Sequence, residues 1–350
     1  PGGFERVRTL LAQEFVAEGH RVGVTLFRHR GELLDQLPNE VSVQALEVDR
    51  ARAAIRPLAA HLRETKPDAV LAGLWPLTAL TAAALKLSRH NCRLVLSEHN
   101  HLSRQYADWG KLHSLAMRAS LSFAHRAADR SVAVSQGVAT DVEALAYLSK
   151  GTVRAIRNPI AVSQTTPDDL AKAESLWATR KGARVLTVGT LKQQKNHSLL
   201  LRAFARLDRN DKTLMFVGDG PEQARIEQLA RELGVEGQIR MAGFQQKTAA
   251  FYHSADVFVL SSNYEGMPNV LGEALASGTN VVSTDCPSGP REILEDGNYG
   301  KLTAVDDVAA LHHAIEATIA EPLPAALLVE RAQMFTPQQI AREYLKELLD

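Results

Sequence analysis

Ser262-Asn-Tyr-Glu-Gly-Met-Pro-Asn-Val-Leu-Gly-Glu-Ala-Leu-Ala-Ser-Gly278 is the stretch of this chain that decides its fold. It follows an apolar run at residues 257–260, which predicts a buried strand. Pro268 suits the first position of a helix, because its missing N–H would be unpaired there anyway. The sequence therefore predicts unpaired N–H groups at residues 269–271 and the positive end of a helix dipole, which together make a phosphate site.

Two carboxylates flank this turn. Glu265 stays in the loop before the helix, whereas Glu273 lies about 7.5 Å along the helix axis from Pro268, at about 1.5 Å per residue. Carboxylates on both sides of a phosphate cradle suit a ligand that carries hydroxyl groups on both sides of a diphosphate, as a nucleotide sugar does. An ordinary amphipathic helix with two surface glutamates is the alternative.

The spacing Glu265-x7-Glu273, in the context EGMPNVLGEALASG, resembles the acidic signature of family 4 retaining glycosyltransferases. This resemblance implies the GT-B fold, an α/β fold with two Rossmann-like, doubly wound parallel-sheet domains that face a central cleft. It implies that Glu265 contacts the donor sugar, that Glu273 contacts the nucleotide ribose, and that the backbone between them holds the diphosphate. The expected activity is transfer of a sugar, with retention, to a glycan or lipid-linked acceptor.

Strand-like runs alternate with helical patterns along the whole chain, which predicts parallel, doubly wound sheets. Ligands bind at the carboxyl ends of the strands in such sheets. His99, Ser135 and Asn158 each follow a predicted strand directly. We expect an acceptor-side domain at residues 1–163 and a donor-binding domain at 164–335. The resemblance implies that the last helix, 336–350, crosses back to the first domain.

The chain opens with Pro1-Gly-Gly-Phe-Glu-Arg6, which leads straight into a helical pattern. A Gly-Gly turn that feeds a helix normally has a strand before it. We therefore expect a first strand upstream of Pro1 in the native gene product. The turn resembles the acceptor-side glycine loop of the family, which implies acceptor-side roles for Gly2 and Gly3.

A second glycine loop, Gly189-Thr-Leu-x3-Lys195, resembles the family's loop that carries an Arg and a Lys for the donor diphosphate. Lys195 matches, whereas Thr190 stands where the Arg usually stands. A desolvated charge-assisted contact contributes about 1.5–3 kcal/mol, so we expect Lys192 or the helix N-terminus to compensate. The donor-site residues implied by the resemblance are Gly189, Thr190, Lys195, Phe244, Gly266, Pro268, Asn269, Val270 and Glu273.

Three further segments resemble the family more weakly. Residues 240–244, ending at Phe244, match the segment around the nucleotide base. The turn at 218–222 is expected to be structural. Arg291, in the segment 288–292, is a weakly indicated phosphate ligand, and a structural role for Glu292 is the alternative.

His99 matches the family's His that touches the donor sugar, and with Glu265 it forms the predicted catalytic set. A structural histidine is the alternative. The sequence contains no Asp-x-Asp triplet, which argues against the metal-dependent glycosyltransferase architecture. It agrees with GT-B enzymes, in which a helix dipole and basic residues stabilise the leaving diphosphate. We expect neither a metal site nor a cofactor, and a UDP- or GDP-linked donor.

Composition is that of a two-domain globular protein, with 350 residues and a formal net charge of zero. Cys92 and Cys286 are the two cysteines, and their separation predicts free thiols in a reducing compartment. No apolar run is long enough to span a membrane. These features predict a cytoplasmic protein, and the zero net charge gives no indication of nucleic-acid binding, so we expect no nucleic-acid partner.

Peripheral contact with a membrane is one expected interaction. The segment 104–130 combines basic residues with apolar Leu112, Leu115, Ala116 and Leu121, and such a segment could lie on an anionic membrane surface. Its basic residues include Lys111, Arg118, Arg126 and Arg130. A core helix with one solvated face is the alternative.

Three other classes of protein compete with a transferase. The first is another GT-B protein acting on nucleotide sugars, such as an epimerase. The second is an NAD-dependent Rossmann enzyme, which is disfavoured because no G-x-G-x-x-G follows a strand with an acidic residue about 20 positions further on. The third is a non-catalytic binding module, which the unusual Thr190 keeps open.

Overall fold

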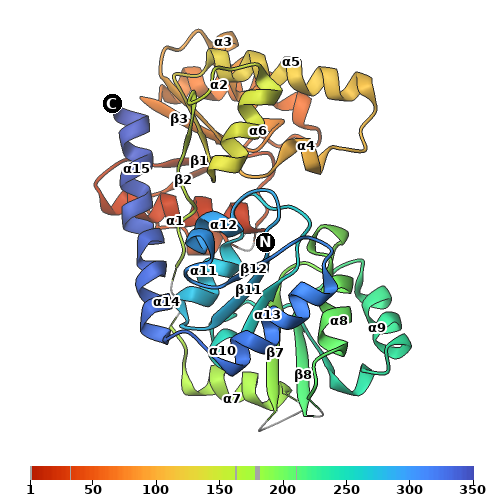
Figure 1. Cartoon of the computed structure of the whole chain (residues 1–350). Coiled ribbons are helices and arrows are strands. Elements are labelled where there is room, and N and C mark those ends of the chain that lie inside the picture. The colour runs from red at the N-terminus through yellow and green to blue at the C-terminus, as the bar shows by residue number, and fades with distance from the viewer. Residues whose placement is uncertain (1, 32, 162–163, 178–181, 210) are drawn as a thin grey trace. The chain divides into compact units, whose positions relative to one another are not determined.

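The computed structural model describes residues 2–31, 33–161, 164–177, 182–209 and 211–350 (Figure 1). The chain divides into two compact units. The first unit consists of Pro1–Pro159 with Phe335–Asp350, and the second consists of Ile160–Met334. Each unit alternates parallel strands with helices, which confirms the predicted doubly wound α/β architecture. Within the described part of the chain, no helix has both the length and the apolar character needed to cross a membrane.

The second unit is built on a parallel sheet whose strand order is β12-β11-β10-β7-β8-β9. The chain enters at β7, adds β8 and β9 on one side, and then returns to add β10, β11 and β12 on the other. The topological switch point therefore lies between β7 and β10, where ligands bind in open α/β sheets. The strands are β7 (Ala183–Val188), β8 (Lys212–Val217), β9 (Ile239–Gly243), β10 (Val257–Leu260), β11 (Asn280–Thr284) and β12 (Lys301–Thr303).

One face of this sheet packs against α8, α9 and α13 in a continuous apolar core. Phe204 of α8 and Phe216 of β8 are both fully buried in it. The helices of the second unit are α7 (Pro167–Leu176), α8 (His197–Ala205), α9 (Gln223–Glu232), α10 (Ala249–His253), α11 (Asn269–Ala276), α12 (Pro290–Ile293), α13 (Val308–Ala320) and α14 (Ala325–Ala332). Short 3-10 turns are η3 (Gln193–Lys195), η4 (Glu236–Gln238) and η5 (Glu295–Gly297).

The first unit contains a parallel pair, β1 (Gly23–Leu26) with β2 (Ser42–Ala45), and a parallel sheet of order β3-β4-β5-β6. The strands of that sheet are β3 (Ala69–Gly73), β4 (Arg93–Glu98), β5 (Arg130–Ala133) and β6 (Val153–Ala155). The helices are α1 (Gly3–Ala17), α2 (Ile55–Thr65), α3 (Leu77–Ser88), α4 (Leu102–Gln105), α5 (Lys111–Ala127), α6 (Gln136–Ala146) and α15 (Pro337–Leu349). The 3-10 turns are η1 (Leu34–Gln36) and η2 (Ala51–Ala54), and η6 (Gln333–Phe335) joins the two units. The upstream strand expected before Pro1 stays a prediction.

Helix α15 packs with α1 in one apolar core of the first unit. Tyr344 and Ile340 of α15 share that core with Val7 and Leu11 of α1. The boundary between the units falls at 159/160, four residues before the predicted one at 163/164. The reason is that Ile160 is 3% exposed and its side chain lies against Gly272 of α11, inside the second unit.

Candidate active site

Two loops meet at the switch point of the second unit. Residues 189–196 follow β7, and residues 261–268 follow β10, the strand that pairs with β7 in parallel. Both loops therefore lie at the carboxyl edge of the sheet. This strand order brings Lys195 and Glu265 next to each other, although they are 70 positions apart in the sequence.

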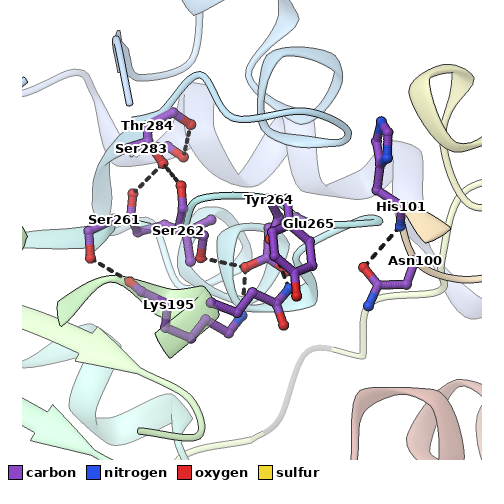
Figure 2. Close-up of polar contacts among 11 residues, drawn as sticks. Asn100, His101, Lys195, Ser261, Ser262, Tyr264, Glu265, Ser283 and Thr284 are labelled. Carbon is purple, nitrogen blue, oxygen red and sulfur yellow. Dashed lines mark hydrogen bonds and ion pairs between the residues drawn. The ribbon is translucent and has the colours of Figure 1, made fainter. Parts of the chain in front are cut away.

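Hydrogen bonds tie these two loops together. The backbone N–H of Asn263 donates to the Gln194 carbonyl at 2.8 Å, and the Gln194 side-chain amide donates to the Tyr264 carbonyl at 2.8 Å. The Ser261 hydroxyl donates to the Lys195 carbonyl at 2.8 Å (Figure 2). The loops form one framework, so a side chain on either of them has a fixed place relative to the other.

Lys195 and Glu265 form an ion pair within this framework. Lys195 Nζ lies 2.6 Å from Glu265 Oε1, and the two side chains are only 15% and 8% exposed (Figure 2). The hydroxyl of Ser262, a fully buried residue, donates to the same carboxylate oxygen at 2.5 Å. Charge-assisted hydrogen bonds of this kind are the strong ones. Lys195, predicted to bind the diphosphate, and Glu265, predicted to bind the sugar, are therefore in direct contact.

Helix α11 begins one residue later than predicted. Pro268 is the N-cap, and Asn269 is the first helical residue. The N–H of Leu271 donates to the Pro268 carbonyl at 3.0 Å. The prediction that Leu271 offers an unpaired donor was therefore wrong, because the extended backbone at Pro268 turns its carbonyl back onto the first turn. The helix dipole still directs its positive end to this loop.

A glycine brings a third loop against this turn. A Cβ added at Gly289 would lie 2.8 Å from the Gly266 carbonyl oxygen and 2.6 Å from Pro268 Cδ. Gly289 also has a φ of +93°, a left-handed conformation that favours glycine. The segment before α12 can therefore close over the start of α11, and a substitution at Gly289 would push it away.

Glu273 lies on the first turns of α11 and is held by a neighbouring helix. Tyr252 of α10, which is 1% exposed, donates its hydroxyl to Glu273 Oε2 at 3.1 Å. Leu271, Ala274 and Leu275 are buried and anchor the helix in the core, whereas Val270 is half-buried.

The glycine loop after β7 is shaped by backbone packing. Gly189 has a φ of +146°, and a Cβ added at Gly218 would lie 2.2 Å from the Gly189 carbonyl oxygen. The turn at 218–222 thus supports the glycine loop. Thr190 is exposed on the loop, as is Lys192. Although Lys192 is exposed as a residue, partial desolvation of its ammonium group lowers its pKa, and the positive charge of Lys195 lowers it further. An anion near both ammonium groups would relieve this repulsion.

Phe244 and Arg291, two other residues predicted to contact the donor, have different surroundings. Phe244 follows β9 and is 52% exposed, so its ring is open to a planar partner, and its N–H donates to Asp219 Oδ2 at 3.1 Å. Arg291 already pairs with Asp285 and with Asp296, and both carboxylates raise the pKa of its guanidinium. A phosphate bound by Arg291 would have to compete with these two ion pairs.

His99 and the Gly-Gly turn belong to the first unit. His99 follows β4, and its ring packs edge-on against Phe4 with centroids 4.8 Å apart. Burial and then the charge of Arg8 hold the pKa of His99 well below its usual range, so the ring is neutral at pH 7. Gly2 is the N-cap of α1 and Gly3 its first residue, and both are exposed.

The sequence did not single out the side chains that hold the two glutamates. Ser262 fixes Glu265 and Tyr252 fixes Glu273. Ser262 carried a weak signal, because it stands at the start of the stretch 262–278, directly after a predicted strand. Tyr252 carried none, since its contact with α11 depends on how two helices pack.

Comparisons with known proteins agree across both units. A family model described as Glycosyltransferase Family 4 matches residues 1–164, and one described as Glycosyl transferases group 1 matches residues 171–335. The chain is 32% identical over 222 residues to the lipopolysaccharide core biosynthesis glycosyltransferase LpsE of Rhizobium meliloti, a match that spans 63% of each chain and so less than two thirds of LpsE. It is 27% identical over 304 residues to the amylovoran biosynthesis glycosyltransferase AmsD of Erwinia amylovora, which covers 85% of this chain and 81% of AmsD.

Solved structures share the fold over almost the whole chain. HepE of Anabaena in complex with UDP-glucose has a TM-score of 0.84 at 22% identity, covering 99% of this chain and 96% of HepE. The apo lipopolysaccharide outer core galactosyltransferase WaaB has a TM-score of 0.73 at 21% identity, covering 99% of this chain and 95% of WaaB. The fold is therefore that of the GT-B glycosyltransferases. The chain belongs to the glycosyltransferases that these two family models describe, with the Glycosyltransferase Family 4 model matching its first half and the Glycosyl transferases group 1 model matching its second half.

Proposed function

We propose that this chain transfers a sugar from a UDP- or GDP-linked donor to a glycan or lipid-linked acceptor in the synthesis of cell-surface polysaccharide, lipopolysaccharide or glycolipid. The observation that carries this proposal is the buried Lys195–Glu265 pair at the switch point, beside the N-terminus of α11. It joins a cation for a diphosphate to a carboxylate for sugar hydroxyls. The names of LpsE and AmsD support the class of product, and HepE has been solved with UDP-glucose.

The proposed reaction proceeds with retention and without a metal. The bond from the anomeric carbon to the phosphate oxygen breaks, and the acceptor oxygen forms its bond to that carbon on the same face. The acceptor proton passes to the leaving phosphate oxygen. Lys195 and the dipole of α11 offset the charge that develops on the leaving diphosphate. The absence of an Asp-x-Asp triplet from the sequence supports independence from metal.

A donor panel followed by product analysis tests this proposal. UDP- and GDP-sugars are screened by thermal shift, in which a tight binder stabilises the chain by RT ln(1 + [L]/Kd). The best binder is then incubated with and without acceptor, with chelator present. For an α-linked donor, proton NMR should first detect an α-linked product or α-anomer together with free nucleoside diphosphate. Early β-anomer, or activity abolished by the chelator, would contradict retention or metal independence.

The same reaction mixtures separate the alternatives. An epimerase would convert the donor into an isomeric nucleotide sugar without releasing nucleoside diphosphate. A binding module would be stabilised by the donor and would leave it unchanged over hours. Either result would replace the transferase proposal.

We also propose that the transferase acts in the cytoplasm, in peripheral contact with the inner membrane face through α5. An exposed stripe runs along this helix, with Leu112 79%, Leu115 63% and Phe123 40% exposed. Leu121, which the sequence grouped with them, is fully buried, because it faces the core opposite this stripe. The stripe is flanked by basic Lys111, Arg118 and Arg126.

Charge supports an anionic partner for this stripe. Between residues 77 and 128 the acidic residues are Glu98 and Asp108, against seven lysines and arginines, although the whole chain has zero net charge. Glu98 is fully buried, so Asp108 is the acidic residue of this segment whose side chain is exposed. A basic, apolar helix face of this kind binds anionic lipid surfaces.

Co-sedimentation with lipid vesicles tests the membrane contact. The chain should bind vesicles that contain anionic phospholipid and should bind purely zwitterionic vesicles much more weakly. Leu112→Ser together with Leu115→Ser should weaken binding at least tenfold, since burying each leucine contributes about 1.5–3 kcal/mol. Leu170→Ser, at an exposed leucine of α7, is the matched control and should bind as the wild type does. Equal binding by both variants, or dimers in light scattering that the double variant abolishes, would refute the assignment.

A further inference from the structure

A buried polar network surrounds His99 in the first unit. The guanidinium of Arg8 donates through Nη2 to Ser97 Oγ at 2.7 Å. Ser97 Oγ lies 2.6 Å from His99 Nε2, and Arg8 Nη2 lies 3.4 Å from the same ring nitrogen. Two polar atoms in this network, Arg8 Nη1 and His99 Nδ1, are buried and have no hydrogen-bond partner among the residues that the structure describes.

The proton positions in this network follow from what each group can do. A guanidinium only donates hydrogen bonds, so Ser97 Oγ accepts the bond from Arg8. The Ser97 hydroxyl retains its own proton, and His99 Nε2 is its short-range partner. If Nε2 carried a proton, that N–H would face the donor groups of Arg8 at close range. Nε2 is therefore the acceptor, and the single ring proton of neutral His99 lies on Nδ1.

Glycine at position 73 makes room for this arrangement. A Cβ added at Gly73, the last residue of β3, would lie 2.3 Å from Arg8 Nη2 and 2.6 Å from a ring carbon of Phe4. The Arg8 guanidinium also lies over the Phe4 ring, 4.9 Å from its centroid. The rotamers of Arg8 and Phe4 are thus fixed by the end of β3 on one side and by the His99 ring on the other.

From this geometry we infer that Arg8 and Ser97 are positioning residues, which hold His99 as an Nδ1–H donor for an oxygen atom of the sugar. The nature of that ligand rests on the proposed function, whereas the tautomer rests on the network alone. In this state the one basic nitrogen of His99 is occupied by Ser97 and Arg8. His99 therefore gives a hydrogen bond to a sugar hydroxyl or ring oxygen, and it does not take a proton from the acceptor.

The surrounding charges support a neutral ring. The titratable groups that act on this network are Arg8 of α1, Glu98 of β4 and Tyr344 of α15. Burial lowers the pKa of Arg8, whereas Tyr344 and Glu98 act to raise it. An arginine guanidinium keeps its charge in proteins. Glu98 itself accepts hydrogen bonds from the Trp75 N–H and the Thr78 hydroxyl. A cation beside His99 Nε2 disfavours a second positive charge on the ring.

Nitrogen NMR of the full chain tests the tautomer directly. The chain has 12 histidines, so the His99 signals in a ¹⁵N-histidine sample are assigned by their loss in His99→Gln. The wild type should show a protonated Nδ1 and an unprotonated, hydrogen-bonded Nε2 for His99 at neutral pH. Ser97→Ala and Arg8→Met should each shift His99 toward the Nε2–H tautomer, and Arg8→Lys should preserve part of the wild-type signal.

A second serine–histidine pair gives the matched control. His125 Nδ1 lies 2.8 Å from Ser131 Oγ in the same unit. Ser131→Ala should change the His125 signals, leave those of His99 in place and leave kcat/KM for transfer unchanged. Ser97→Ala should lower kcat/KM about tenfold while the affinity for free nucleoside diphosphate stays constant. Ser97→Ala should add little to His99→Ala, because residues that act through one group are not additive.

The outcomes separate this inference from the proposed function. An Nε2–H tautomer for His99 in the wild type would overturn the inference even in an active transferase. The wild-type tautomer together with additive losses in Ser97→Ala/His99→Ala would also overturn it, because Ser97 would then act independently of His99. A chain that shows the Nδ1–H tautomer but turns over no nucleotide sugar would refute the proposed function and leave the network assignment standing.

Discussion

Lys195→Met should weaken the binding of free nucleoside diphosphate about 10- to 150-fold. The reason is the loss of one desolvated charge-assisted contact, which contributes about 1.5–3 kcal/mol. Lys195 is 15% exposed and fixed by Glu265, so its ammonium needs little reordering to meet a diphosphate. Titration calorimetry with UDP and GDP measures the effect. Lys192→Met is the control, and its loss should be clearly smaller because Lys192 is exposed and repelled by Lys195.

Stability has to be measured alongside affinity. Removing one partner of a buried ion pair costs about 3–5 kcal/mol, and the hydroxyl of Ser262 would still bind Glu265 in this variant. The double variant Lys195→Met/Glu265→Gln removes both charges and should recover much of the lost melting temperature without recovering nucleotide affinity. Similar small losses of affinity in Lys195→Met and Lys192→Met would refute the role of Lys195. So would a double variant that binds nucleotide like the wild type.

Glu265→Gln and Glu273→Gln should impair different steps, transfer of the sugar and binding of the nucleotide respectively. Glu273 is held on α11 by Tyr252, where we place the ribose, so Glu273→Gln should weaken nucleoside diphosphate binding about tenfold. Glu265 lies in the loop where we place the sugar. Glu265→Gln should therefore lower kcat/KM at least about 100-fold while product inhibition by the nucleotide changes little. Steady-state kinetics with the nucleotide as inhibitor measures both effects.

Tyr252→Phe gives an internal check on this assignment. It removes the hydroxyl that donates to Glu273 and leaves the buried ring in place, so it should reproduce part of the Glu273→Gln defect. The placement would be contradicted if Glu265 controlled nucleotide affinity while Glu273 and Tyr252 were dispensable for it.

Much of the fold was readable from the sequence because its signals are local. The apolar run at 257–260 is observed as β10 with the predicted bounds. Ser135 shows the limit of such reasoning. It follows a predicted strand as a site residue would, yet it is the N-cap of α6 and accepts a hydrogen bond from the Val138 N–H at 3.3 Å. A polar residue after a strand has the same signature whether it caps a helix or binds a ligand.

The candidate site was readable only in part because its contacts depend on strand order. The sequence picked out Lys195 and Glu265 separately, each for a ligand. Their ion pair required β10 to return beside β7, and the sequence does not state that pairing. The start of α11 also differed by one residue, because the ψ of 96° at Pro268 is set by the packing of its loop. The sequence picked out His99 alone, and it gave no signal for the contacts of His99 with Ser97 and with Arg8, which lies about 90 residues away.

Hydrogen–deuterium exchange of the full chain, with and without UDP or GDP, tests most directly whether the switch point of the second unit is the donor site. Proteolytic fragments resolve the exchange along the sequence. We expect the nucleotide to slow amide exchange in residues 189–195 and 266–273, and we expect Lys195→Met to abolish this protection at the same nucleotide concentration. Protection confined to other segments, or protection at these loops that survives in Lys195→Met, would contradict this assignment.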